Sequence, residues 1–321
     1  MRRTADTPAR VVVLGAGVSG LSCALLLAEA GHAVTLWSRA EPLATTSAVA
    51  AAIWYPFEAG PPERVAGWAS RSYRRFAELA EAGVPGVVPI TVHDLHSPLH
   101  PRPAWVTAMD GFRELPPADC HGHQEGWAAR VAVIETPLYL AWLAERVRAR
   151  GVHVELRDVR DLEETRGFDA VVNCTGLGAR ELVGDKRCFA IKGQIVRVPR
   201  GAVTRALYFQ KEGGAFGYIV PRSEDCVLGG TAERGVETLT SDAETTRAIL
   251  ARCRAFEPRL AQEPLSVGVG LRPGRDEIRV ERERLADGRW IVHDYGHGGC
   301  GVTLSWPCAE DARALVLEAL A

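Results

Sequence analysis

The sequence predicts an α/β protein made of two interleaved modules. Three observations support this. A buried strand, a glycine-rich turn and an alanine-rich helix follow one another between residues 11 and 30. Apolar strands of the same kind recur near residues 170 and 290. Between them, the chain reads as shorter strands that would form a second, mostly antiparallel sheet. Such returns to one sheet after long insertions are typical of discontinuous modules.

Composition excludes several classes of protein. The 321 residues are 47% hydrophobic and 24% charged, with a formal net charge of −2, which is unlike a general nucleic-acid binder. No apolar run approaches the roughly 18–20 residues of a membrane span. The start, MRRTADTPAR, lacks the apolar core of a secretory signal. The eight cysteines show no CxxC spacing, so we expect thiols in a reducing cytoplasm, with one disulfide left open.

The first module begins with a strand at Val11–Leu14, a helix from about Val18 to Ala30, and a second strand at 33–37. Gly15-Ala16-Gly17-Val18-Ser19-Gly20 joins the first strand to the helix and fits G-x-G-x-x-G. In a Rossmann-type unit the three glycines serve the turn, the approach of a pyrophosphate, and helix–strand packing. The free N–H groups of the helix N-terminus would bind phosphates. The pattern predicts dinucleotide binding, against the alternative of a tight turn alone.

The residues after the second strand leave the nucleotide open. Ser38 and Arg39 stand where an acidic residue usually contacts the ribose. Arg39 could bind a 2′-phosphate, which would favour NADP. The long insertion that follows favours FAD instead, because FAD proteins commonly close this fold with a distant segment. Thr45, Thr46 and Ser47 offer hydroxyls to phosphate; the alternative is a buried loop with ordinary turn chemistry.

The remaining elements can be placed from apolar runs and end signals. We expect helices at 63–82, at 136–150, at 241–256 with Ser241 as cap and Glu244 three residues on, and from about Cys300 onward. We expect strands at 152–156, 169–176, 193–198, 218–221, 226–230, 267–273, 277–281 and 289–294. The first module would comprise residues 1–50, 135–185 and 265–321. The second would comprise 51–134 and 186–264.

Chemistry-bearing residues gather late in the chain. Arg272 ends the strand VGVGLRP and could hold a carboxylate through two parallel hydrogen bonds. Tyr218 could bond the same carboxylate. The alternatives are a surface ion pair and a half-buried strand tyrosine. The stretch HDYGHGGCG (293–301) is rich in glycine, so much of its backbone carries no side chain. This would serve either a tight turn or the close approach of a flat ligand.

No metal site is expected. His293 and His297 have HxxxH spacing, but the glycines prevent a helix and no third ligand is evident.

Seven segments, spread over almost the whole chain in the same order, resemble the D-amino-acid oxidase family of flavoenzymes. The stretch from about 58 to 130 matches poorly. The segments are VVVLGAGVSGLSCALLL, TTSAVAAAIWYP, NCTGLGAREL, KGQIVRV, YIVPR followed by LGG, VGLRPGRDEIRVERE, and HDYGHGGCGVTLSWPCA.

The resemblance implies a glutathione-reductase-like, FAD-binding module with non-covalent FAD, interleaved with an α+β substrate module. It makes Arg272 and Tyr218 the clamp for the substrate carboxylate and the Gly299 carbonyl the acceptor for the amino group. Tyr55 would shape the side-chain pocket. It assigns FAD contacts to Gly15, Ala16, Gly17, Val18, Ser19, Gly20, Ser38, Arg39, Thr45, Thr46, Ser47, Ala51, Ala52, Trp54, Val159, Cys174, Thr175, Gly176, Arg272, Gly296, Gly298, Gly299, Gly301, Val302 and Thr303.

The implied activity is oxidation of a neutral D-amino acid by hydride transfer from Cα to flavin N5. Oxygen would be the acceptor, and a 2-oxo acid, ammonia and H₂O₂ the products, in a cytoplasmic enzyme that could be a homodimer. Gly214 stands where family members carry a second tyrosine, which implies a short or absent lid.

Several alternatives stay open. One is a D-aspartate oxidase, although Arg222 and Arg234 cannot be placed in the pocket and Ala232 stands where an arginine would help. The others are a glycine or sarcosine oxidase, a non-catalytic flavin module, and an NADP-dependent reductase that uses Arg39.

Overall fold

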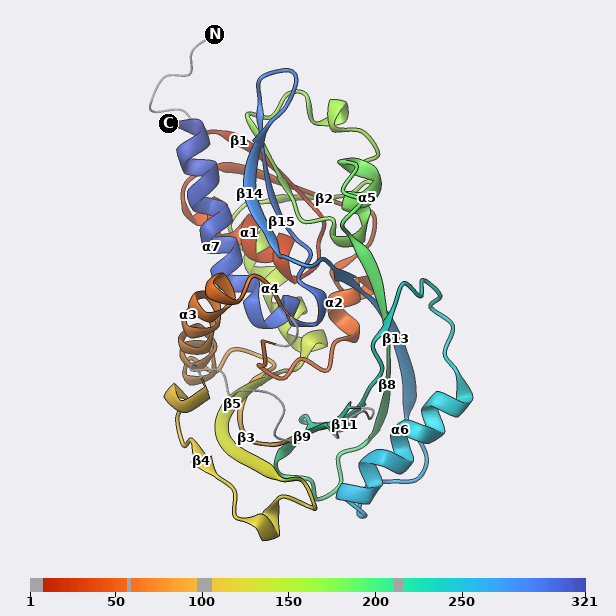
Figure 1. Ribbon diagram of the computed structural model, residues 1–321. Helices are drawn as coiled ribbons and strands as arrows, with labels where there is room; N and C mark the ends of the chain where they lie inside the picture. Colours follow the sequence, from red (N-terminus) through yellow and green to blue (C-terminus); the bar gives the residue numbers. More distant parts are fainter. Residues whose placement is uncertain (1–7, 57–58, 97–105, 211–215) are drawn as a thin grey trace.

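The computed structural model describes residues 8–56, 59–96, 106–210 and 216–321. They form two sheets, one above the other in Figure 1. The first has six strands in the order β14-β15-β7-β1-β2-β6. All its neighbours pair in parallel except the β14–β15 hairpin. The bounds are β1 Arg10–Leu14, β2 Ala33–Ser38, β6 His153–Leu156, β7 Ala170–Asn173, β14 Arg279–Arg284 and β15 Trp290–Tyr295.

Both faces of the first sheet are covered. Helices α1 (Val18–Glu29) and α7 (Gly301–Leu320) pack together on one face, and α4 (Thr136–Ala149) packs against α1. Val11 and Val13 of β1 belong to the core under these helices. Val12 and Leu14 belong to the apolar cluster on the opposite face. The continuous apolar run of β1 is therefore buried on both sides, as expected of a central parallel strand.

The second sheet has nine strands and is antiparallel except where β3 runs parallel to β9. Its order is β12-β8-β11-β10-β9-β3-β5-β4, with β13 also paired to β8. The bounds are β3 Val87–His96, β4 Arg113–Glu114, β5 Glu125–Ile134, β8 Phe189–Pro199, β9 Ala206–Gln210, β10 Phe216–Pro221, β11 Asp225–Gly229, β12 Glu233–Arg234 and β13 Ser266–Gly274.

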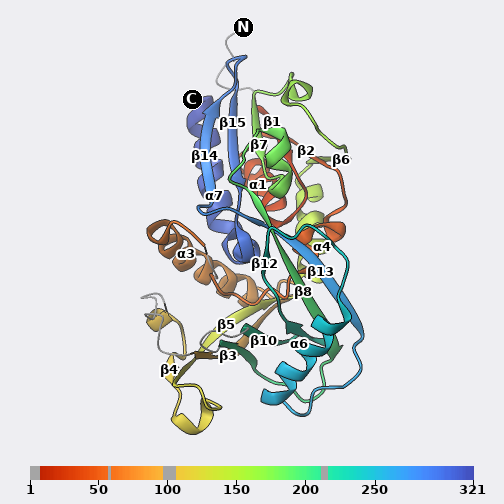
Figure 2. The ribbon, with the colours of Figure 1, turned by 45° about the vertical axis from the view of Figure 1, so that its right-hand side comes forward.

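Two helices accompany the second sheet. Helix α6 (Ala243–Phe256) packs against β8, β10 and β11, and it lies along this sheet in both Figure 1 and Figure 2. Helix α3 (Pro62–Glu81) contacts α7 as well as β3 and β5. It therefore ties the two sheets together. No described helix is both long and apolar enough to cross a bilayer.

The structure differs from the sequence expectations in several places. The strand expected at 267–273 pairs with β8 along its whole length, so it joins the second sheet rather than the first. Helix α6 is capped by Asp242, whose carboxylate accepts from the Thr245 N–H at 2.6 Å, and not by Ser241. Strand β9, between Ala206 and Gln210, was not anticipated because its five residues carry no period that stands out.

Candidate functional site

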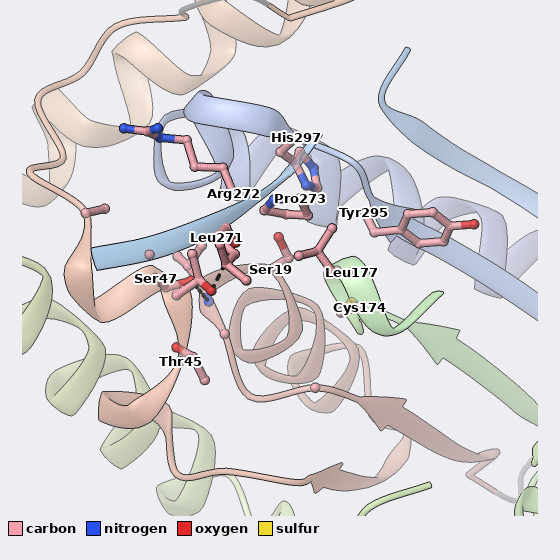
Figure 3. A pocket seen from close by; sticks show the side chains of 18 of the residues that line it. Ser19, Thr45, Ser47, Cys174, Leu177, Leu271, Arg272, Pro273, Tyr295 and His297 are labelled. Atoms are coloured by element: carbon pink, nitrogen blue, oxygen red, sulfur yellow. Dashed lines mark hydrogen bonds between the residues drawn. The ribbon is translucent and has the colours of Figure 1, made fainter. Parts of the chain in front are cut away.

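One large cavity, of about 850 Å³, lies where the two sheets meet. The glycine loop before α1, the end of β2, the short helix α2 (Thr46–Val49) and the turn after β7 line one part. Strands β8, β10 and β13 and the glycine turn before α7 line the other. In Figure 3, Ser19, Ser47 and Cys174, from three separate segments, lie near the start of α1, and the side chain of Arg272 points away from them.

Most residues expected at the site line this cavity. They are Gly15, Ala16, Gly17, Val18, Ser19, Ser38, Arg39, Thr45, Thr46, Ser47, Ala51, Ala52, Tyr55, Val159, Cys174, Thr175, Gly176, Tyr218, Arg272, Gly298, Gly299, Gly301, Val302 and Thr303. Gly214, where we expected the shortened lid, lies outside the described residues.

Three expected residues lie elsewhere. A Cβ on Gly20 would come within 1.8 Å of the Gly15 carbonyl oxygen, so this glycine serves helix–strand packing. Trp54 is a core residue that donates from Nε1 to Ser72 Oγ at 3.0 Å. Gly296 has φ +84° and packs against the Arg275 side chain. These positions support the walls of the cavity rather than form its surface.

The loop from Gly15 to Val18 is held from two sides. Gly15 has φ +105°, and a Cβ there would lie 2.5 Å from the Cys174 carbonyl oxygen. The N–H of Ala16 donates to Ser38 Oγ and the N–H of Val18 to Ser47 Oγ, both at 3.1 Å. Ser38 also donates to the Ala40 carbonyl oxygen at 2.8 Å. The residue that replaces the usual acid therefore fixes the phosphate-loop conformation.

The cavity fits a dinucleotide. Its middle lies at the α1 N-terminus, where close backbone approach and N–H groups suit a pyrophosphate. One end reaches the segment 157–160, which includes Val159, and the other reaches β8, β10 and β13. Phosphate in the middle and planar groups at both ends is the layout of FAD.

Arg272 and Tyr218 come together at the far end. Arg272 Nη1 donates to the Thr231 carbonyl oxygen at 2.9 Å. Burial raises the pKa of the Tyr218 phenol, while the positive charge and a hydrogen bond of Arg272 oppose that rise. Glycines make room for both side chains. A Cβ on Gly193 would lie 2.3 Å from Arg272 Nη1, and one on Gly229 would lie 1.8 Å from Tyr218 Cζ.

The glycine turn at 296–301 is braced from behind. Gly298 has φ +53°, and α7 begins at Gly301. Behind the turn, Asp185 Oδ2 accepts from Tyr295 Oη at 2.8 Å and from Arg275 Nε at 3.0 Å. Burial opposes ionisation of Asp185, but these hydrogen bonds and the Arg275 charge hold its pKa below the usual value. A fixed ion pair thus positions the bare backbone that faces the cavity.

Thr303, expected among the FAD contacts, has its hydroxyl bonded within the protein. Its Oγ1 donates to the Tyr55 carbonyl oxygen at 3.1 Å and accepts from the Tyr55 N–H at 3.3 Å. Thr303 therefore fixes Tyr55 to the start of α7.

Of the two histidines of the HxxxH pattern, His297 but not His293 lies in a cluster of three possible ligands. Atoms of Asp294, His297 and Cys308 lie within 4.8 Å of one another, and all three residues are buried. Burial, and then the Asp294 charge, raise the pKa of the Cys308 thiol well above its usual value. His297 Nε2 lies 3.2 Å from Asp294 Oδ1, so the three residues form a polar cluster inside the protein.

A row of aromatic rings was missed by sequence reasoning. Tyr208 stacks on Tyr55 with centroids 5.0 Å apart, and Phe216 stands 6.4 Å from both Tyr208 and Tyr218. All four residues line the cavity. Only the unanticipated strand β9 brings Tyr208 opposite Tyr218, so no local sequence signal could have revealed it.

Comparison with known proteins identifies the class. Residues 10–315 match the family model described as FAD dependent oxidoreductase. The chain belongs to this family of FAD-dependent enzymes, and the resemblance to the D-amino-acid oxidase family is confirmed.

Three relatives match nearly full length. The chain is 48% identical to a D-amino-acid oxidase of Rubrobacter xylanophilus, over 97% of each chain. It is 41% identical to a D-amino-acid oxidase of Streptomyces coelicolor, over 95% of this chain and 96% of that protein. It is 36% identical to the human D-aspartate oxidase, over 97% of this chain and 95% of that protein.

Solved structures confirm the fold class. Glycine oxidase from Geobacillus kaustophilus superposes with a TM-score of 0.76, at 20% identity, over 97% of this chain and 95% of that one. L-proline dehydrogenase from P. horikoshii superposes with a TM-score of 0.77, at 16% identity, over 97% of this chain and 94% of that one.

Proposed function

We propose that the protein is a D-amino-acid oxidase that deaminates neutral D-amino acids. Oxygen is the electron acceptor, and the products are a 2-oxo acid, ammonia and H₂O₂. The observation that carries the proposal is the pairing of Arg272 with Tyr218 on the cavity wall that also includes the glycine turn. The names of the relatives at 48% and 41% identity support it.

The chain's own residues would hold FAD along the cavity. The loop from Gly15 to Ser19 and the hydroxyl of Ser47 would hold the pyrophosphate, and the segment around Val159 the adenine end. The turn at 298–303 would face the isoalloxazine. When bound, FAD accepts the hydride from the substrate Cα.

Substrate orientation is the work of three groups. Arg272 presents a planar guanidinium that suits a carboxylate, and Tyr218 adds a hydroxyl beside it. The carbonyl of Gly299 would accept from the amino group. Together they fix two substituents of Cα, the carboxylate and the amino group; with the side chain in the pocket beside Tyr55, this sets the stereochemistry of Cα and its distance from the cofactor. No side-chain base is required once the amine is neutral.

The placement of the other arginines favours neutral substrates over D-aspartate. Arg222 is buried and bonded to Asp225 at 2.9 Å, and exposed Arg234 pairs with Asp276 at 3.1 Å. Neither is among the described residues that line the cavity, nor is Ala232. An acidic side chain would find no such partner there.

The module division belongs to the same proposal. The pieces at 1–50, 135–185 and 275–321 would bind FAD, and the second sheet, now including β13, would bind substrate. A cytoplasmic location is supported by eight free cysteines. A homodimer completes the proposal, and light scattering of the purified protein tests it.

Anaerobic titration of the purified protein tests the reaction. D-Alanine, D-valine, D-aspartate, glycine, L-alanine and NADPH are added in turn while the flavin band near ~450 nm is followed. Bleaching by neutral D-amino acids alone, with H₂O₂ formed on admission of air, is expected. Bleaching by D-aspartate alone, by glycine alone or by NADPH alone would replace the proposal with the matching alternative. A yellow protein that none of them bleaches would be a flavin-binding module.

A further inference from the structure

A buried carboxylate stands in line with the substrate end of the cavity. Asp94 of β3 is paired in register with Tyr208 of β9, and Tyr208 is paired with Tyr218 of β10. Residues paired in register across neighbouring strands point to the same face of a sheet. Asp94 therefore lies on the cavity-facing side, two strands away from the tyrosine assigned to the substrate carboxylate.

Tyr55 separates Asp94 from the cavity. Its hydroxyl donates to Asp94 Oδ2 at 2.9 Å. Its ring stacks on Tyr208 at 5.0 Å, with 18° between the ring planes. Tyr55 lines the cavity and Asp94 does not. The aromatic row from Tyr218 to Tyr55 thus leads from the carboxylate clamp to a wall with a negative charge behind it.

The charge of Asp94 is sheltered from water. The residue is 2% exposed, and its other oxygen lies 3.6 Å from Nδ1 of His96. Burial, followed by the charge of Asp94, raises the pKa of Tyr55 well above its usual value. Tyr55 therefore keeps its proton and directs it at Asp94.

We infer that the charge of Asp94, held behind Tyr55, makes the side-chain pocket reject acidic D-amino acids. The inference rests on the proposed function. Asp94 is a positioning residue, since it does not line the cavity. A substrate carboxylate at this wall would meet a buried like charge directly behind Tyr55. Specificity often depends on such a repulsive element as well as on attraction.

The test compares substrates of the same shape. D-Asparagine and D-aspartate differ in charge and hydrogen-bond donors but hardly in size, as do D-glutamine and D-glutamate. Discrimination is measured as kcat/KM for the amide divided by kcat/KM for the acid. This ratio does not depend on the amount of active enzyme. Turnover of D-alanine by the wild-type holoenzyme establishes the proposed function first. Without that turnover the proposed function fails, whatever the ratio.

Three variants separate the effect of the Asp94 charge, the effect of the Tyr55 hydroxyl and effects that any charge removal nearby would have. Asp94→Asn removes the charge but keeps an acceptor for Tyr55. Tyr55→Phe removes the hydroxyl but keeps the ring and the charge. Glu125→Gln is the matched control, because Glu125 lies 3.6 Å from the other nitrogen of His96, is exposed, and does not line the cavity.

The wild-type amide-to-acid ratio should be at least about tenfold, and Asp94→Asn should lower it by at least about tenfold. The change should lie mainly in KM for the acid. Tyr55→Phe should retain most of the discrimination, and Glu125→Gln should stay within about twofold of wild type. An unchanged ratio in Asp94→Asn, or an equal change in Glu125→Gln, would overturn the inference. If Asp94→Asn does not fold, a wild-type ratio near one still overturns it.

Discussion

The guanidinium of Arg272 lies directly over the backbone of Gly193, where a Cβ would come within 2.3 Å of Nη1. The two residues belong to neighbouring strands, and only the absence of a side chain at 193 lets the arginine lie flat on β8. Gly193 therefore makes the room in which the Arg272 guanidinium lies.

Replacement of Gly193 by alanine should displace Arg272. We expect KM for D-alanine to rise by about tenfold or more, because a shift of about 1 Å in a positioning group is costly, while FAD stays bound. Steady-state kinetics and the flavin spectrum measure both. Gly67→Ala is the control, since a Cβ at Gly67 meets nothing within 4 Å. Equal KM values in the two variants would contradict the prediction.

Removal of Arg272 should separate substrate binding from cofactor binding. Arg272→Ala is expected to raise KM for neutral D-amino acids at least ~tenfold with FAD still bound, because a charge-assisted pair with the carboxylate is lost. Arg234→Ala removes an exposed cation that does not line the cavity and should leave KM unchanged. A normal KM in Arg272→Ala would refute the assigned role.

Loss of Asp185 should destabilise the protein strongly. Arg275 and Asp185 are each 4% exposed in their side chains, so Asp185→Ala leaves a buried cation unpaired, at a cost of about 3–5 kcal/mol. Urea unfolding of the apoprotein measures the loss. Asp276→Ala, which breaks an exposed pair with Arg234, should cost under about 1 kcal/mol. Similar losses of unfolding free energy in both variants would mean that burial does not determine how much an ion pair contributes to stability.

Stability should fall as the pH drops below about 6.5. Burial, followed by the charge of Arg279, lowers the pKa of His293 to about 4 in the folded protein. The unfolded chain, with a histidine pKa near ~6.5, binds the proton first. The stabilising contribution is complete above pH ~6.5 and is lost progressively toward pH ~4.

The variant His293→Asn isolates this contribution. It should flatten the decline of urea midpoints between pH ~6.5 and ~4 relative to the wild type. His93, whose pKa is also lowered to about 4, chiefly by burial, would account for part of the remaining slope. A decline of the same steepness in His293→Asn would show that His293 does not titrate in this range.

Signals between neighbouring residues predicted much of the fold and part of the site. The apolar run of β1, the glycines at 15, 17 and 20 and the helix that follows are neighbours in sequence, and their conformations follow from local sterics and burial. The same reasoning placed β7, β15 and the start of α7. Local signals therefore predicted the glycine loop, whereas Arg272 and Tyr218 were placed at the site by the family resemblance; Gly15, Gly17, Arg272 and Tyr218 all line the cavity.

What the sequence determined by itself was the set of elements and the residue types that carry chemistry. Only the tertiary structure decided which elements pair. Strand β13 joins β8 across roughly seventy residues, and β9 sets Tyr208 between Asp94 and Tyr218. Strand register depends on long-range hydrogen bonds and packing, which leave no mark in the neighbouring residues. The buried charge behind Tyr55 could therefore be found only once the second sheet was assembled.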